Sequence, residues 1–277
     1  GGDFARFYAD VELVIDWSPR AQALFWRRRD PDIYFKAGLT WPRRTQRGFN
    51  VRLLPEGCVF ADKGPAMFPN RESDRDFLLG LLNSTFIEYA LRCFTSFGSW
   101  EMSAVRRLPF PDTDSKERTT VAALARQIAD AKARWDEGNE VCTRFVLPWI
   151  LQFSERESMA IRLSDLAERE ASEDRCIADA YARINAAVYR LYGISDEVRM
   201  SVESSLGETP RESIWPQMEG KDAEQKRMEH VWRLLSFAVK RVIEADDDGI
   251  VPFSQATGET RLADRVRQEL VSFFPER

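Results

Sequence analysis

The stretch that decides the fold covers residues 76–111 and reads DFLLGLLNSTFIEYALRCFTSFGSWEMSAVRRLPFP. Its apolar side chains recur on one broad face as far as Tyr89, which predicts a helix that is buried on that side. Gly98 interrupts the pattern, and a short helix is expected after it, until Pro109 and Pro111 end that helix. We interpret the stretch as mainly architectural, because it supports a sheet and leads into a polar helix.

The sequence before this stretch alternates as short β-strands do, and strands are expected at residues 11–17, 33–35, 39–41, 47–54 and 58–61. Pro55 and Gly57 lie between the last two strands. They predict a hairpin turn, because proline fixes φ and glycine allows positive φ. A short helix is expected over residues 20–29, and its last turn carries an arginine triplet at 27–29, where cations suit the helix dipole.

Downstream, the chain is expected to be almost wholly helical from residue 114 onwards. Two apolar stripes, at residues 121–135 and 177–191, have the alternating three-and-four spacing of coiled coils. Further helices are expected at residues 141–153 with a kink at Pro148, at 156–171, after a cap at Ser195, and at 228–244 and 262–274.

These patterns place the chain in the α+β class, with a mixed, β-rich N-terminal domain (residues 1–112) followed by a mostly α-helical domain (residues 113–277). The whole chain has a net charge of −5, yet residues 17–54 carry nine Lys or Arg against two Asp. Residues 1–110 hold 16 basic and 13 acidic side chains, so the first part is basic and the remainder is acidic. This asymmetry favours an anionic partner bound locally, and the alternative is a basic face in water.

The sequence argues against several kinds of site. His230 is the only histidine, and the four cysteines include no Cys-x-x-Cys, so no metal site is predicted and free thiols in a reducing cytoplasm are expected. No apolar run is long enough to span a membrane. Glycine-rich loops for phosphates or a methyl donor, and a Pro-Pro pair for a flipped base, are missing from the sequence. We therefore expect neither a catalytic residue nor a cofactor site in this chain.

The features that point to recognition lie between two of the predicted strands. Arg43, Arg44, Thr45, Gln46 and Arg47 form a polar, basic segment there. Arginine makes bidentate hydrogen bonds to guanine or phosphate, and glutamine does so to adenine. Such a loop can both position and specify a DNA duplex. The alternative is a surface hairpin whose arginines are solvated.

Lys63 and Trp100 are secondary candidates for DNA binding. Lys63 lies beside Gly64 and offers a further cation. Trp100 follows Phe97 and Gly98 in a glycine turn, where an exposed ring would stack on a base or wedge into DNA. The alternative for Trp100 is a ring that packs its loop onto the sheet.

Several segments, in this order, resemble the C-terminal part of the PglX-like adenine-specific DNA methyltransferases of BREX phage-defence systems, and of the similar DISARM and type IIG enzymes. YFKAGLTWPRRT with GFNVRLLPEGCVFADKGPAMF resembles the opening of their target recognition domain, and FLLGLLNSTFIEYAL with FGSWEMSAVRRLPFP resembles its close. The segment LPFPDTDSKERTTVAALARQIADAK resembles the spacer helix of this family. INAAVYRLYGISDEVRMSVESSLG and LLSFAVKRVIEADDDGIVPF resemble later segments, although the family's Gly-Arg after SFAV is absent.

The resemblance implies that this chain is the target recognition and helical scaffold part of an enzyme that methylates adenine in DNA. The cofactor S-adenosylmethionine would be bound by a separate catalytic domain or subunit. The implied partners are double-stranded DNA, that catalytic part and other defence-system proteins, in the cytoplasm and away from a membrane. Two alternatives stay open: a protein-interaction scaffold that uses the acidic helical half, and an enzyme that is active by itself.

Overall fold

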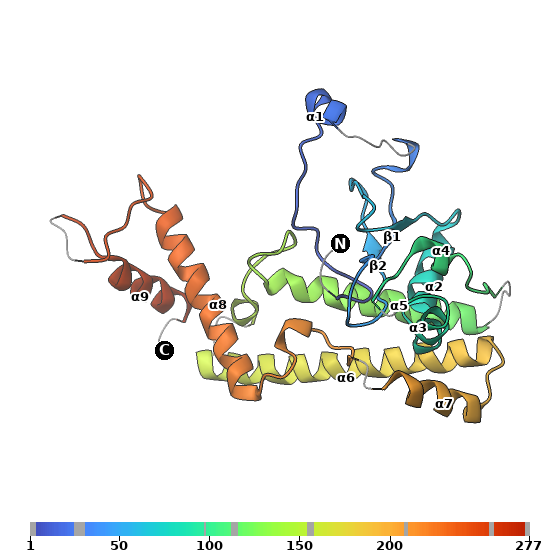
Figure 1. Cartoon of the computed structure of the whole chain (residues 1–277). Helices are drawn as coiled ribbons and strands as arrows, with labels where there is room; N and C mark the ends of the chain where they lie inside the picture. Colours follow the sequence, from blue (N-terminus) through green and yellow to red (C-terminus); the bar gives the residue numbers. More distant parts are fainter. Residues whose placement is uncertain are drawn as a thin grey trace. The chain divides into compact units, whose positions relative to one another are not determined.

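The computed structural model describes residues 4–24, 31–96, 98–111, 116–153, 158–207, 210–254 and 258–274 (Figure 1). In chain order the helices and strands are α1 (Pro19–Leu24), β1 (Gly38–Thr40), β2 (Arg52–Leu54), β3 (Ala66–Met67), α2 (Glu72–Leu82), α3 (Thr85–Arg92), α4 (Met102–Val105), α5 (Lys116–Trp135), α6 (Met159–Leu191), α7 (Asp196–Leu206), α8 (Ala223–Glu244) and α9 (Leu262–Phe273). Short 3₁₀ turns occur at Pro31–Ile33, Asp136–Gly138, Trp149–Leu151 and Pro216–Met218. The described chain is therefore α+β, mostly helical with one small sheet.

Contacts divide the chain into two compact units. Unit 1 comprises Gly1–Ala133 and Asp174–Ile214, and unit 2 comprises Arg134–Glu173 and Trp215–Arg277. The long helices α5 and α6 each contribute residues to both units. The sequence instead predicts a boundary after residue 112, between a recognition domain and a helical domain. That boundary stays a prediction.

The sheet of unit 1 has three antiparallel strands, with β1 between β2 and β3. Leu39 is fully buried in β1, opposite Leu53 in β2 and Met67 in β3. Helix α2 lies against β1. The strand expected at residues 39–41 is thus confirmed to within one residue, and Gly57 turns the chain after β2 with a φ of +80°.

The N-terminal segment joins this sheet at Phe7. The Phe7 N–H donates to the Val51 carbonyl over 2.7 Å, and the Leu53 N–H donates to the Phe7 carbonyl over 3.1 Å. Phe7 is fully buried and has a φ of +68°. The Tyr8 N–H donates to the Arg6 carbonyl over 2.8 Å, so the chain makes a tight turn around Phe7 and leaves the sheet again.

The strand expected at residues 11–17 is wrong. Val14 is fully exposed, and none of the described strands pairs with this segment. A strand needs a partner for its N–H and C=O groups, and an apolar run alone does not supply one. The strand expected at residues 33–35 is also wrong, because Phe35 has a φ of +66°, which is incompatible with extended backbone.

Helix α1 confirms the beginning of the helix expected over residues 20–29. The arginine triplet at 27–29 lies outside the described residues, and so do Phe97 and the start of the spacer helix at residue 114.

Helices α2 and α3 replace the single helix expected here, and Asn83 between them shows why. The Asn83 side chain is buried, donates to the Val51 carbonyl over 2.7 Å and accepts from the Val51 N–H over 2.8 Å. The same amide donates to the Leu79 carbonyl over 2.9 Å. Ser84 then begins α3 by accepting from the Ile87 N–H. The Asn83 amide therefore binds the helix pair to the backbone that precedes β2.

The two apolar stripes predicted downstream are buried within unit 1 for most of their length. Val121 and Ile128 of α5 are fully buried, and so are Ile184 and Val188 of α6. Gly80 of α2 allows close approach to α5, because a side chain there would collide with Val121. These stripes are therefore core, and they are not a coiled-coil surface left open for a partner.

Unit 2 is built around the pair α8 and α9. Ala238, Val242 and Val266 form an apolar cluster where α9 lies against α8. Helix α8 begins with a capping box, in which the Asp222 side chain accepts from the Gln225 N–H and the Gln225 side chain accepts from the Asp222 N–H. This reciprocal cap explains why α8 begins five residues before the helix expected from residue 228.

Residues 141–153 do not form the expected kinked helix. Only Trp149–Leu151 turns there, as a short 3₁₀ segment after Pro148. The Trp149 ring lies 5.3 Å from the Trp135 ring, and its Nε1 donates to the Trp135 carbonyl over 2.8 Å. The segment is therefore held by the tertiary contacts of one aromatic side chain, and it does not form a regular helix. In contrast, α6 is continuous where two helices were expected.

Candidate nucleic-acid interface

The basic segment (residues 43–47) follows β1 after two residues and is fixed by backbone hydrogen bonds. The Thr45 N–H donates to the Gly98 carbonyl over 3.1 Å, and the Trp100 N–H donates to the Arg43 carbonyl over 2.8 Å. The segment thus pairs with the loop before α4 as a short antiparallel ladder. These hydrogen bonds use the backbone of the segment, so they do not engage its side chains.

Trp100 is part of the core beneath this ladder. It is fully buried, its ring lies 5.5 Å from the Phe49 ring, and its Nε1 donates to the Thr45 carbonyl over 3.2 Å. The Trp100 carbonyl accepts from Trp41 Nε1 over 2.9 Å. The ring is therefore not exposed for base stacking, and its burial agrees with the packing alternative: Trp100 holds the basic segment from below.

Arg43 is the most strongly engaged side chain of the segment. Its Nε lies 2.9 Å from both carboxylate oxygens of Glu101, and its Nη1 lies 3.6 Å from Asp62. The hydrogen bond that Arg43 donates to the Glu101 carboxylate raises the pKa of Arg43 above its ordinary value. Arg43 therefore joins the basic segment to the start of α4. Sequence reasoning missed Glu101, since the two side chains are 58 residues apart in the chain and no local pattern signals their pairing.

The other long side chains of the segment are exposed. Arg44 and Gln46 are both open to solvent, and the Gln46 amide lies over Gly98, where an added side chain would come within 2.6 Å of it. Arg47 is exposed as well, and its guanidinium lies 5.2 Å from the centre of the Phe4 ring. Within the described ranges, no carboxylate pairs with Arg44, so its charge is not neutralised there.

Lys63 extends this surface from a neighbouring loop. Its carbonyl accepts from the Arg43 N–H over 3.1 Å, so the two loops lie side by side. The Lys63 side chain is exposed and makes no ion pair with a described residue, whereas the adjacent Asp62 lies near Arg43. The structure thus brings Lys63 to the basic segment, and contact of these residues with DNA stays a prediction.

A buried ion network lies behind the segment. The Arg6 guanidinium is 1% exposed and lies 3.5 Å from Glu88 and 3.6 Å from Glu212. Lys132 of α5 pairs with the same Glu212, and both side chains are buried. Gly48 sits against Glu88 with a φ of +109°, and an added side chain would lie 2.7 Å from its carboxylate. Glycine at this position therefore lets the chain pass from the basic segment over the network.

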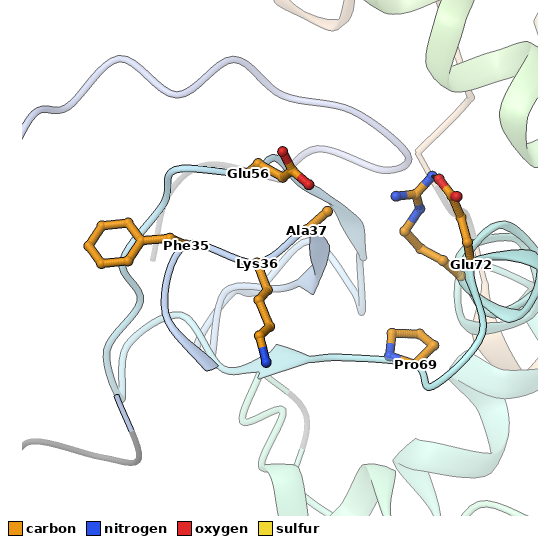
Figure 2. A pocket seen from close by; sticks show the side chains of 7 residues that line it. Phe35, Lys36, Ala37, Glu56, Pro69 and Glu72 are labelled. Atoms are coloured by element: carbon orange, nitrogen blue, oxygen red, sulfur yellow. Dashed lines mark hydrogen bonds and ion pairs between the residues drawn. The ribbon is translucent and has the colours of Figure 1, made fainter. Parts of the chain in front are cut away.

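Unit 1 also has an open hollow of about 310 Å³ between the sheet and the start of α2. It is lined by Phe35, Lys36, Ala37, Glu56, Pro69, Glu72 and Arg75 (Figure 2). Arg75 lies 3.0 Å from Glu72, so these two charges on its wall are paired with each other. The hollow shows no combination of nucleophile and base, and the described residues contain no cluster of His, Cys, Asp and Glu that fits a metal ion.

No protein-family model matches the chain. The chain is 25% identical over 142 residues to the adenine-specific methyltransferase BrxX of Escherichia coli O9:H4 (strain HS), which covers 50% of this chain and 12% of that protein. It is 24% identical over 147 residues to the adenine-specific methyltransferase PglX of Lacticaseibacillus casei (strain Zhang), which covers 49% of this chain and 12% of that protein.

The two matches support a relationship to adenine-specific methyltransferases, as the resemblance in the sequence suggests. Each match spans only about an eighth of the relative's length, so it concerns a small part of that methyltransferase. None of the described helices combines the length and apolar character that crossing a membrane requires.

Proposed function

We propose that this chain is the DNA recognition part of an adenine-specific, S-adenosylmethionine-dependent DNA methyltransferase of a phage-defence or restriction-modification system. The observation that supports it most is the basic segment itself: exposed Arg44, Gln46 and Arg47 project from a backbone that is hydrogen-bonded on one side. A rigid support with exposed bidentate donors is what reading of base edges requires. The two methyltransferase relatives make DNA the anionic partner to test first.

The structure suggests separate tasks for the residues of this surface. Arg44 and Gln46 are the candidates for contacts to bases, since both side chains are exposed. Arg47 and Lys63 are candidates for phosphate contacts. Arg43 is engaged with Glu101 and Asp62, and Trp100 is buried, so we assign both to holding the surface in place.

In this proposal, chemistry takes place elsewhere. A separate catalytic domain or subunit binds S-adenosylmethionine and transfers the methyl group to adenine in the cytoplasm. The helical part of this chain holds the recognition surface at a fixed position relative to that catalytic part, and it offers a place for other defence-system proteins.

The test is a titration of duplex DNA of about 30 base pairs, containing a randomised core, with the 277-residue chain at about 50 and 200 mM salt. We expect affinity to fall steeply with salt, and sequencing of the bound fraction to show a preference that Arg44→Ala with Gln46→Ala weakens. The double variant Arg175→Ala with Arg227→Ala is the matched control, because both arginines are exposed on the helices α6 and α8. If the wild-type chain shows no salt-dependent binding, the proposal is refuted.

A protein-interaction scaffold is the second candidate, and unit 2 supplies the observation in its favour. Trp232 on α8 is 59% exposed and Phe253 before α9 is 87% exposed. Large apolar side chains of this kind are enriched at protein interfaces. A stable complex with another defence-system protein that survives the Arg44→Ala change but not Trp232→Ala would favour this function over DNA reading.

A further inference from the structure

We infer that Arg106 and Arg107, at the end of α4, bind DNA phosphates beside the basic segment and set the orientation of the duplex. This inference rests on the proposed function and names two residues that the sequence does not single out as DNA contacts. It begins with α4, whose inward side chains Ala104 and Val105 are each 5% exposed. Burial of these two residues leaves the next two, Arg106 and Arg107, exposed at the surface.

Helix α4 is attached to the basic segment through its first residues. Glu101, which precedes the helix, is bound by Arg43, and Ser99 pairs with Arg44 in the antiparallel ladder. The Arg106 N–H donates to the Met102 carbonyl over 3.0 Å, so the helical turn continues to Arg106. At about 1.5 Å per residue, the Arg106 backbone lies only about 8 Å along the helix axis from Glu101.

The far end of this short element is fixed as well. The Tyr192 hydroxyl donates to the Pro109 carbonyl over 2.6 Å, and the Phe110 ring lies 5.9 Å from the Phe77 ring of α2. Arg106 and Arg107 are therefore presented between two anchored points. Their backbone is ordered before any ligand binds, which reduces the entropy that binding costs.

The charge balance around α4 favours an anion. Segments 41–50, 61–64 and 98–108 together contain six Lys or Arg and two acidic residues, Asp62 and Glu101. Both acids lie next to Arg43. Arg106 and Arg107 make no ion pair with a described carboxylate, whereas other arginines at helix ends of unit 1, such as Arg92 with Glu88, are paired.

Phosphate is the chemical group that suits two adjacent arginines next to a base-reading loop. Each guanidinium can bind a phosphate with two parallel hydrogen bonds, and neighbouring phosphates on one DNA strand offer repeated sites for such forks. Contacts of this kind fix the register of the duplex without reading its sequence. Arg106 and Arg107 would therefore contribute to affinity and orientation, and Arg44 and Gln46 to sequence preference.

The experiment compares the wild-type 277-residue chain with Arg106→Ala/Arg107→Ala by fluorescence anisotropy on two duplexes of unrelated sequence, over a range of salt concentrations. We expect the slope of log affinity against log salt to decrease by about 1.8, which is two phosphate contacts at about 0.9 each. The loss of affinity should be equal on both duplexes. Arg106→Lys/Arg107→Lys should retain most of the slope, since the charge is kept.

The Arg175→Ala/Arg227→Ala variant removes the same net charge from the surface and should leave the slope unchanged, and far-ultraviolet circular dichroism should show that every variant is folded. An unchanged slope in Arg106→Ala/Arg107→Ala, with normal salt dependence in the wild type, overturns this inference and leaves the proposed function standing. An equal decrease in the control variant also overturns it, because the effect is then one of net charge. Absence of salt-dependent binding by the wild type refutes the proposed function, and this inference with it.

Discussion

The basic segment and the ion network around Arg6 lie in the same unit, and both depend on arginine, yet they treat its charge in opposite ways. Arg6 is almost fully buried and lies between Glu88 and Glu212. Arg44 is exposed, and no described carboxylate pairs with it. A buried charge has to be paired because the interior does not solvate it, whereas an exposed charge is stable without a partner.

The difference separates arginines that stabilise the fold from arginines that are available to a ligand. Arg43 stands between the two extremes, since it is one-third exposed and engaged with Glu101. Burial and pairing together, and not the density of arginine in the sequence, therefore identify the arginines that are available to an anionic ligand. Substitution of a buried, paired arginine should lower the free energy of unfolding, whereas substitution of an exposed arginine should lower the affinity for a ligand.

The largest effect is expected for Arg6→Ala. Removal of Arg6 leaves the buried carboxylate of Glu88 with one fewer cation, and Glu212 with Lys132 alone. Breaking a buried ion pair in this way lowers the free energy of unfolding by about 3–5 kcal/mol. Urea denaturation of the variant and the wild type measures it. A loss similar to that of the exposed Arg44→Ala would show that the buried network does not stabilise unit 1.

Asn83→Ala should have the next largest effect. The substitution leaves the N–H and carbonyl groups of Val51 without the partners that the Asn83 amide supplies. Each buried group left unsatisfied costs about 1–3 kcal/mol. Gln46→Ala is the control, because it removes an exposed amide from the same unit. If both variants unfold at the same urea concentration, the amide bridge does not hold the helices to the sheet.

Glu170 of unit 2 is a buried acid, and its interactions should make the stability of the protein depend on pH. Burial of Glu170 favours its neutral form, but its interactions with His230 and Lys226 outweigh this, and the pKa of Glu170 is lowered from its ordinary value of 4.5. The folded state thus binds this proton less tightly than the unfolded state does. The stabilisation is complete above about pH 4.5 and is lost as pH falls through the lowered pKa.

Glu170→Gln should therefore make unfolding less sensitive to acid below about pH 4.5. Urea denaturation at several pH values between about 3 and 7 measures this, with the exposed Glu12→Gln as the control. If the two variants lose stability in acid in the same way as the wild type, Glu170 does not contribute to the acid sensitivity.

The smallest effect on stability is expected for Arg44→Ala. An exposed side chain of this kind contributes less than about 0.5 kcal/mol to folding. Its effect on DNA affinity should be far larger, at about 1–3 kcal/mol for a lost bidentate contact. Measuring both quantities on the same preparation tests the division directly. A variant that is destabilised, and that binds DNA normally, would place Arg44 with Arg6 among the structural arginines.

The helical elements were the easier part to predict from the sequence. Val121 and Ile128 recur at helical spacing and are buried in α5, and Ser195 caps α7 as its hydroxyl chemistry suggests. In these cases a local pattern carries the information, because a helix makes its hydrogen bonds within one segment. The strands were harder, since the apolar run at residues 11–17 has no partner strand, and partners are set by contacts distant in sequence.

The candidate site was only partly predictable for the same reason. The chemistry of Arg44 and Gln46 is visible in the sequence, and the structure places both at the surface. The burial of Trp100 and the engagement of Arg43 with Glu101 depend on contacts over more than fifty residues of chain. No local pattern distinguishes a glycine turn that exposes a tryptophan from one that buries it.

Phe7 and Gly38 both lie beside β2, since Phe7 pairs with Arg52 and Gly38 with Leu54. The part of the chain between them, residues 8–37, therefore begins and ends beside β2. The entropy of closing such an excursion grows only with the logarithm of its length. A change in the length of this excursion should therefore cost little stability, while the register of β1 and β2 is kept.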